Sequence, residues 1–179
     1  MQLIGRSALL IAGAMAALTS LVPAAAAKTA TIGQATVLNS AGVVSGDLRL
    51  IDRGGAVELK LAVRGLPAGQ HGVHLHTIGS CNAPDFASAG GHLNPHGRMH
   101  GSANPQGSHL GDLPNLVVGR SGKGSLTARL AGTRADLWPV LFDGDGTALV
   151  VHAAADDYRT DPSGNSGTRF ACGVLTPAR

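Results

Sequence analysis

The sequence is poor in aromatic and charged residues, a scarcity that excludes several classes of protein. Only 3% of its 179 residues are aromatic, 14% are charged, and glutamate occurs once, at Glu58. A coiled coil needs sustained heptads, and a nucleic-acid-binding surface needs clustered basic charge well above the net +3 found here. The 26 glycines show no three-residue period, which excludes collagen, and the 44% of hydrophobic residues argues against intrinsic disorder.

The first 27 residues have the pattern of a secretory signal peptide. Arg6 gives the positive start, residues 7–27 carry no charge, and Pro23 precedes a run of alanines. A membrane anchor is the alternative, but Pro23 and the alanine run favour cleavage near Ala27, before Lys28. The segment holds no cysteine for lipid attachment. We therefore expect residues 28–179 to form a soluble, exported domain with no membrane span.

Export changes the interpretation of the only two cysteines, Cys81 and Cys172. In an oxidising compartment an even pair is typical of a disulfide, which we expect here. Two buried free thiols are the alternative. A disulfide across so long a loop would stabilise the fold by roughly 4–5 kcal/mol on the chain-entropy argument.

Short alternating or β-branched segments, separated by clusters of glycine, proline, asparagine and aspartate, predict an all-β domain. We expect eight strands forming a β-barrel or sandwich, and no amphipathic helix of useful length. The predicted strands are residues 29–38, 44–51, 56–63, 72–78, 116–119, 124–130, 147–152 and 169–175.

Two long stretches contain no predicted strand, residues 79–115 and residues 153–168. Loops of this length in a compact domain are uncommon unless they are functional or disordered. The first stretch holds most of the histidines, and a bound metal ion would order a loop that lacks a core of its own.

Histidine is the residue that the chain has in excess. Seven of its eight histidines lie between His71 and His109. On a predicted strand, His74 and His76 place both imidazoles on one face, where they can converge on a single metal ion. Taken alone, the pair is explained equally well by one core histidine and one surface histidine.

Further candidate ligands follow in the first long loop and at the end of a later strand. The loop contributes His92, His100, His109 and Asp112 among glycines and prolines that exclude a helix, and His152 ends an apolar strand. Several imidazoles and one carboxylate suit a borderline cation such as zinc. The sequence therefore predicts a metal site.

Taken together, these stretches resemble the bacterial exported copper/zinc superoxide dismutases. The resemblance covers nearly all of the chain after the signal peptide and implies an eight-stranded Greek-key β-barrel or sandwich with two long functional loops. It also implies dismutation of superoxide to dioxygen and hydrogen peroxide at an imidazolate-bridged copper/zinc site, as antioxidant defence of the cell envelope. The expected location is the periplasm, with release from the cell as the alternative. The matching segments are residues 71–76, 90–95, 100–101, 109–114, 150–158 and 167–174.

The resemblance also implies roles for individual residues. Asp156 resembles the carboxylate that links a copper ligand to a zinc ligand, Arg169 resembles the arginine beside the copper, and Cys81 and Cys172 match the intrachain disulfide. The implied copper ligands are His74, His76, His92 and His152, and the implied zinc ligands are His92, His100, His109 and Asp112, with His92 bridging both metals.

Some features stay outside this assignment. We interpret His71 as structural and expect His96 to be exposed. Residues 153–168 form a shorter loop than in animal members of the family, and we give its charged residues Asp157, Arg159 and Asp161 no role. A homodimer is compatible with the resemblance, but subunit arrangement does not carry over from animal members.

Three other functions fit parts of the pattern. A metal-binding or metal-delivery protein of the same fold would lack a copper ligand or the arginine, and none is missing here. A copper-only relative would lack the zinc ligands of the loop, which are present. A zinc hydrolase needs three ligands and an open water position, which would leave three histidines and Arg169 without a role.

Overall fold

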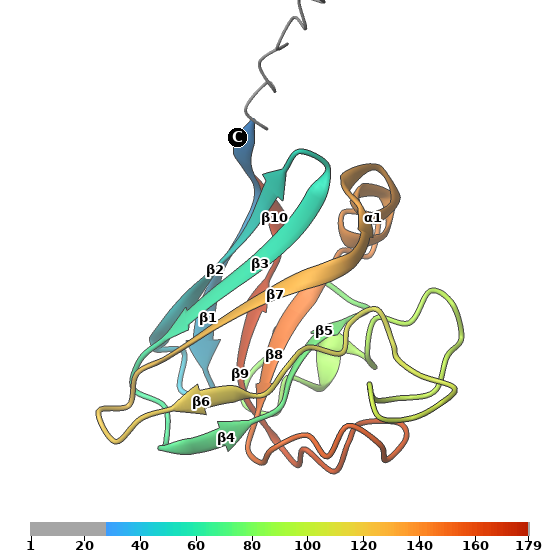
Figure 1. Cartoon of the computed structure of the whole chain (residues 1–179). Coiled ribbons are helices and arrows are strands. Elements are labelled where there is room, and N and C mark those ends of the chain that lie inside the picture. Colours follow the sequence, from blue (N-terminus) through green and yellow to red (C-terminus); the bar gives the residue numbers. More distant parts are fainter. Residues whose placement is uncertain (1–27, 179) are drawn as a thin grey trace, which may run out of the picture.

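The computed structural model describes residues 28–178, in which one antiparallel sheet is wrapped into a nearly closed barrel (Figure 1). The predicted signal peptide, residues 1–27, lies outside the described part. No helix of the described residues is long and apolar enough to span a membrane. The strands are β1 (Thr29–Asn39), β2 (Val44–Arg53), β3 (Ala56–Val63), β4 (Gly69–His71), β5 (Val73–His76), β6 (Leu116–Val118), β7 (Gly124–Thr133), β8 (Ala148–His152), β9 (Arg169–Val174) and β10 (Thr176–Pro177); the helices are the single 3₁₀ turn η1 (Ala87–Ala89) and α1 (Arg134–Leu141).

The barrel closes because its two edge strands are neighbouring pieces of the chain. The strand order is β4-β6-β7-β3-β2-β1-β9-β8-β5, with β10 paired to β1, and only Gly72 separates β4 from β5. The amide of Gly72 donates to the carbonyl of Ala154, and its carbonyl accepts from the amide of His152, both at 2.8 Å. The strand that carries His74 and His76 is thus fixed to the end of β8.

The all-β prediction is confirmed, and each of the eight predicted segments contains a strand. The structure adds the two short strands β4 and β10. No amphipathic helix of useful length was expected, and the α-helix that the described residues contain, α1, spans only eight residues. Its N-terminus is a capping box between Thr133 and Asp136, the local signal in the sequence. The helix is too short to show an amphipathic pattern, and Pro139 lies inside it.

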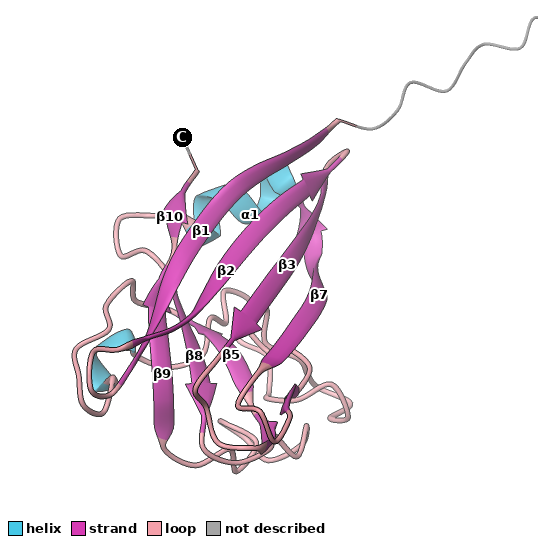
Figure 2. Cartoon of the chain, turned by 90° about the vertical axis from the view of Figure 1, so that its left-hand side faces the viewer, coloured by secondary structure: helices cyan, strands magenta, loops and turns pink. Residues whose placement is uncertain are grey.

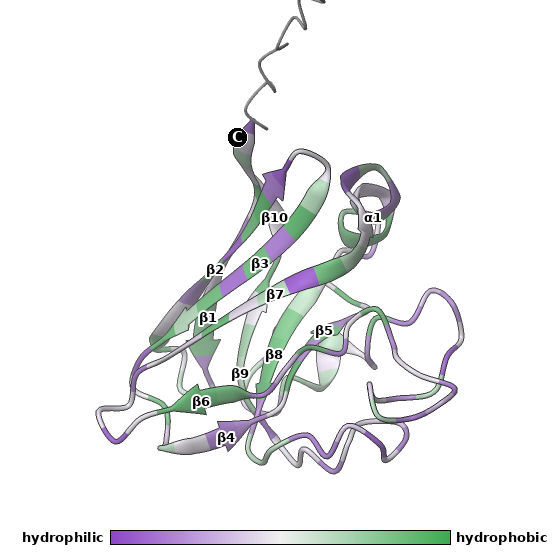
Figure 3. Cartoon of the chain, viewed as in Figure 1, coloured by the Kyte–Doolittle hydropathy of each residue, from purple (hydrophilic) through white to green (hydrophobic). Residues whose placement is uncertain are grey.

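Alternation of apolar and polar residues builds the core of the barrel. Strands β1, β2, β3 and β7 lie side by side on one face (Figure 2) and bury every second residue over much of their length. Strand β8, mostly hydrophobic in Figure 3, is buried at all five positions. Leu149 and Val151 point into the main core, and Val150 joins a smaller cluster with Phe86 and Cys172. Both faces of β8 are therefore covered, as its unbroken apolar run requires.

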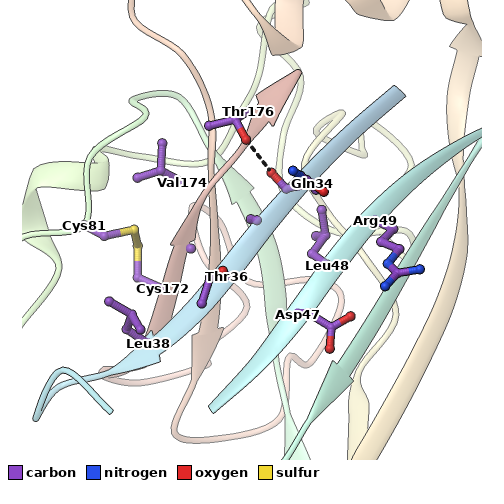
Figure 4. Close-up of a pocket in the computed structure, with 12 residues that line it drawn as sticks. Gln34, Thr36, Leu38, Asp47, Leu48, Arg49, Cys81, Cys172, Val174 and Thr176 are labelled. Carbon is purple, nitrogen blue, oxygen red and sulfur yellow. Dashed lines mark hydrogen bonds between the residues drawn. A yellow bond between two sulfur atoms is a disulfide. The ribbon is translucent and has the colours of Figure 1, made fainter. Parts of the chain in front are cut away.

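The expected disulfide between Cys81 and Cys172 is present. It joins the start of the first long loop to β9, and Figure 4 shows it beside a hollow lined by β1, β2 and β9. In the same hollow, the hydroxyl of Thr176 donates to the carbonyl of Gln34 at 3.2 Å. The disulfide therefore anchors the loop where it leaves the barrel.

We predict that the disulfide accounts for a large share of the stability. The two cysteines are 91 residues apart. On the chain-entropy argument, a loop of that length gives about 4–5 kcal/mol. A Cys81→Ser/Cys172→Ser double variant should therefore unfold at a clearly lower urea concentration, measured by circular dichroism. An unchanged midpoint would show that closing this loop does not stabilise the fold.

Candidate metal centre

The first long loop folds back across β5, which brings its histidines to those of the barrel. The amide of Leu75 donates to the carbonyl of Gly111 at 2.9 Å, and the carbonyl of Leu75 accepts from the amide of Leu93 at 2.8 Å. His74 and His76 flank Leu75 and point out of the barrel, into the space that the loop covers. His152 reaches the same space from the end of β8, the strand paired with β5.

Four histidines gather at one end of this space. His74, His76, His92 and His152 each offer a ring nitrogen, and these four nitrogens all lie within 4.8 Å of one another. All four are buried and have no hydrogen-bond partner among the described residues. Buried polar atoms are normally paired, because an unpaired one costs free energy. A cation with nitrogen ligands would satisfy all four at once.

The opposite nitrogens of three of these rings face hydrogen-bond acceptors. Nδ1 of His76 lies 2.9 Å from the carbonyl of Gly90, and Nδ1 of His152 lies 3.2 Å from the carbonyl of Gly167. Nε2 of His74 lies 2.8 Å from a carboxylate oxygen of Asp156. Because these oxygens only accept, the facing nitrogens carry the protons. The lone pairs are therefore on the nitrogens that face one another.

A second group forms around one oxygen of Asp112. Its Oδ1 lies 3.1 Å from Nδ1 of His92, 3.0 Å from Nδ1 of His100 and 3.2 Å from Nδ1 of His109. Ligands of a tetrahedral zinc ion, at roughly 2.0–2.2 Å from the metal, lie about 3.4 Å from one another. The other oxygen, Oδ2, accepts from the amides of Gly101 and His109 at 2.9 and 3.0 Å. The carboxylate is thereby aimed at the three imidazoles.

The two groups touch at His92 and are joined by Asp156. His92 presents Nδ1 to the second group and Nε2 to the first. Asp156 binds His74 through Oδ2 at 2.8 Å and His100 through Oδ1 at 3.0 Å. Both of these histidines are 0% exposed. Gly164, at φ +63°, passes so close to Asp156 that a Cβ there would overlap the carboxylate.

The electrostatics of the site favour neutral imidazoles beside ionised carboxylates. Burial lowers the pKa of His76 to about 2, of His152 to about 3 and of His92 to about 4. Burial acts to raise the pKa of Asp112 and Asp156, but hydrogen bonds from imidazoles and backbone amides outweigh it, and both pKa values are lowered. Neutral imidazole and ionised carboxylate are the protonation states that bind metal ions.

Arg169 lies next to the first group and is held in place by the backbone. It faces His152 in the register between β8 and β9. Its Nη1 donates to the carbonyl of Phe86 at 2.6 Å, and its Nη2 donates to the carbonyl of Gly90 at 2.7 Å. The same Gly90 carbonyl accepts from His76, so one backbone group orients both the guanidinium and an imidazole of the first group.

The two remaining histidines lie outside the centre. His71 is buried, with its ring nitrogens 2.8 Å from the carbonyl of His152 and 3.0 Å from that of Pro67. His96 is exposed, as expected. The carbonyls of Gly90 and Gly167 could not be identified from the sequence, because no residue type marks a backbone acceptor.

Comparisons with known proteins agree with this arrangement. Residues 44–175 match the family model "Copper/zinc superoxide dismutase". The chain is 41% identical to "Superoxide dismutase [Cu-Zn] 2" of Aquifex aeolicus over 79% of this chain and 84% of that one. It is 37% identical to "Superoxide dismutase [Cu-Zn]" of Escherichia coli K12 over 73% and 78%.

Solved structures of a superoxide dismutase and of a superoxide dismutase-like protein have a similar fold. A superoxide dismutase-like protein of Bacillus subtilis superimposes with a TM-score of 0.71 at 38% identity, covering 80% of this chain and 97% of that one. The Cu/Zn superoxide dismutase of Brucella abortus has a TM-score of 0.63 at 29% identity, covering 82% and 99%. The chain belongs to the copper/zinc superoxide dismutase family.

Proposed function

We propose that this protein catalyses the dismutation of superoxide, in which two superoxide anions and two protons give one dioxygen and one hydrogen peroxide. The observation that carries the proposal is the set of four buried, unpaired imidazole nitrogens beside the fixed guanidinium of Arg169. A zinc hydrolase would need only one group of metal ligands, and it would not need this arginine.

The ligands we propose follow from which ring nitrogen is free. His74 through Nδ1, and His76, His92 and His152 through Nε2, would hold copper. His92, His100 and His109 through Nδ1, together with Asp112, would hold zinc. His92 belongs to both sets, and it would bridge the metals as an imidazolate.

The protein residues contribute binding, orientation and proton transfer. When bound, copper supplies the one-electron redox chemistry, and zinc, which has none, supplies charge and geometry. Asp156 fixes the orientation of one imidazole of each set. We assign to Nε2 of His92, in the state in which it does not bind copper, the uptake of a proton and its delivery to the reduced oxygen species. The site needs no large pocket, because the substrate has only two atoms.

Arg169 docks the anionic substrate. Its guanidinium keeps a positive charge at any working pH and makes strong hydrogen bonds to oxygen anions. Two of its N–H groups are taken by Phe86 and Gly90, which leaves the others for superoxide. Because the net charge of the chain is only +3, attraction of the substrate depends on this local placement.

We also propose where the protein acts. Residues 1–27 would direct export and be removed near Ala27, and the domain would then work in the periplasm, in defence of the cell envelope. The disulfide between Cys81 and Cys172 supports an oxidising compartment, where such bonds persist. Most of the relatives described above are bacterial copper/zinc superoxide dismutases by name.

One prediction of the proposed function concerns a copper ligand. A His152→Ala variant, loaded with copper and zinc, should remove superoxide at no more than the rate of uncatalysed decay, because one imidazole of the first group is lost. Pulse radiolysis measures the decay, and elemental analysis measures the bound metals. The matched control is His96→Ala, which replaces an exposed histidine outside the centre and should leave the rate unchanged. If the wild-type protein holds both metals and does not accelerate the decay, it binds or delivers metal without turnover.

Another prediction of the proposed function concerns Arg169. Charged hydrogen bonds of this kind contribute about 1.5–3 kcal/mol, so Arg169→Ala should lower the rate constant about ten- to a hundredfold. Arg169→Lys keeps the charge but not the forked contact with Phe86 and Gly90, and it should recover only part of the rate. Copper content should stay unchanged in both variants. Loss of copper together with activity would mean that Arg169 acts on metal binding instead.

The lowered histidine pKa values predict acid sensitivity of the metal-free protein. In the unfolded chain, His76, His92 and His152 bind protons near pH 6.5, whereas in the fold their pKa values are about 2, 4 and 3. The unfolded state therefore binds more protons at acidic pH, and stability is lost as pH falls below about 6.5. Each buried histidine contributes up to about 1.4 kcal/mol per pH unit. Urea unfolding at several pH values measures how steeply the free energy of unfolding depends on pH. His152→Ala should make this dependence less steep. An unchanged dependence in that variant would contradict the lowered pKa of His152.

A further inference from the structure

We propose that Asp161 is a positioning residue of the zinc half of the centre, holding His100 and His109 in their ligating arrangement from the second long loop. The inference rests on the zinc site in the proposed function. Asp161 is not a ligand in that site, and its loop lies beside the histidine loop, with the amide of Ala103 bonded to the carbonyl of Tyr158 at 3.0 Å.

The first contact is with the backbone of His100. Its amide donates to Oδ1 of Asp161 at 2.6 Å, a short hydrogen bond to a charged acceptor. The next amide along the chain, that of Gly101, donates to Oδ2 of Asp112 at 2.9 Å. Two consecutive amides are thus held by two carboxylates, one from each long loop. This fixes the direction in which the His100 side chain leaves the backbone.

The second contact is with the imidazole of His109. Nδ1 of this ring faces Asp112 and His92, at 3.2 Å from Asp112 Oδ1 and 3.4 Å from His92 Nδ1, so Nε2 points the other way. There it meets Oδ1 of Asp161 at 4.0 Å. This separation is too long for a hydrogen bond. The negative charge still favours the proton on Nε2, which leaves the lone pair on Nδ1 for the metal.

The surroundings of Asp161 support this role. Among the ion pairs of residues 28–178, its only partner is His109, with no lysine or arginine that would make it part of an ordinary surface salt bridge. Its side chain is 37% exposed, whereas that of Asp156 is 0% exposed. The buried Asp156 binds the side chain of His100, and the partly exposed Asp161 binds its backbone amide.

The test is the rate at which zinc leaves the protein. The wild-type protein and its variants, each produced from the full sequence and loaded with copper and zinc, are mixed with an excess of a zinc-binding dye. Loss of a carboxylate that supports a metal-ligating histidine typically weakens metal binding about 10–100-fold, so zinc release from Asp161→Ala should be about tenfold faster or more. Asp161→Asn keeps an oxygen for the His100 amide but lacks the charge facing His109. Its rate of zinc release should therefore lie between those of the wild-type protein and Asp161→Ala.

Asp157→Ala is the matched control. Asp157 lies in the same loop, and its carboxylate is bonded to Thr160 and Asn165 of that loop, not to the histidine loop. Zinc release from this variant should stay within about twofold of wild type. Equal acceleration in Asp157→Ala would overturn the proposal, because general loosening of the loop would then be enough. Wild-type release rates in Asp161→Ala would also overturn it.

The zinc content of the wild-type protein separates this inference from the proposed function. If the wild-type protein binds no zinc, both fail. If it binds zinc and removes superoxide while Asp161→Ala releases zinc at the wild-type rate, only the role of Asp161 fails. Circular dichroism of each variant before mixing checks that the barrel has folded.

Discussion

The carboxylate of Asp156 is the side chain that joins three parts of the molecule at once, namely β5 and the two long loops. It binds one histidine of β5 and one of the first long loop, and it also accepts the amide of Tyr158 at 2.6 Å in its own loop. The two contacts with the histidines are buried, where an unpaired carboxylate would be costly. The position of each loop is therefore coupled to the position of the other and to the barrel.

This coupling matters because few apolar side chains of the two long loops are buried, and all of them belong to the first loop. Leu93 and Leu113 join the extensive core of the barrel, and Phe86 and Ala89 join a smaller cluster with two barrel residues and the disulfide. Hydrogen bonds to carboxylates, close backbone approaches at glycines and the covalent link to β9 add to these few apolar contacts. Gly101, at φ +96°, illustrates this, since a Cβ there would overlap the carbonyl of Tyr158. The binding of metal ions would add to these constraints, because metal-binding energy becomes folding energy.

The sequence predicted the barrel well, because alternation and turn residues are local signals. The short strands β4 and β10 were missed, since two or three residues carry no readable period. The short helix α1 was missed because its eight residues show no amphipathic pattern and include Pro139, although the capping box between Thr133 and Asp136 marks its start.

The predicted candidate ligands do come together, because histidines at strand positions and in a glycine-rich loop are visible as residue types. The orienting partners were only partly predictable. Asp156 was identified through the family resemblance, but the carbonyls of Gly90 and Gly167 were not, because any residue has a carbonyl. Asp161 was noted only as a charge without a role. Its contact with His100 spans 61 residues and depends on how two irregular loops meet, which no local pattern encodes.

The disulfide has a role in the centre as well as in stability. Cys172 lies on β9, the strand that begins with Arg169, and Cys81 begins the segment that carries the carbonyls of Phe86 and Gly90. Those carbonyls hold the guanidinium, and Gly90 also fixes the ring of His76. The covalent bond therefore ties the guanidinium of Arg169 and the carbonyl that orients His76 to one strand. Under the proposed function, breaking it would release both together, so that substrate docking and metal geometry would depend on the same oxidised pair of cysteines.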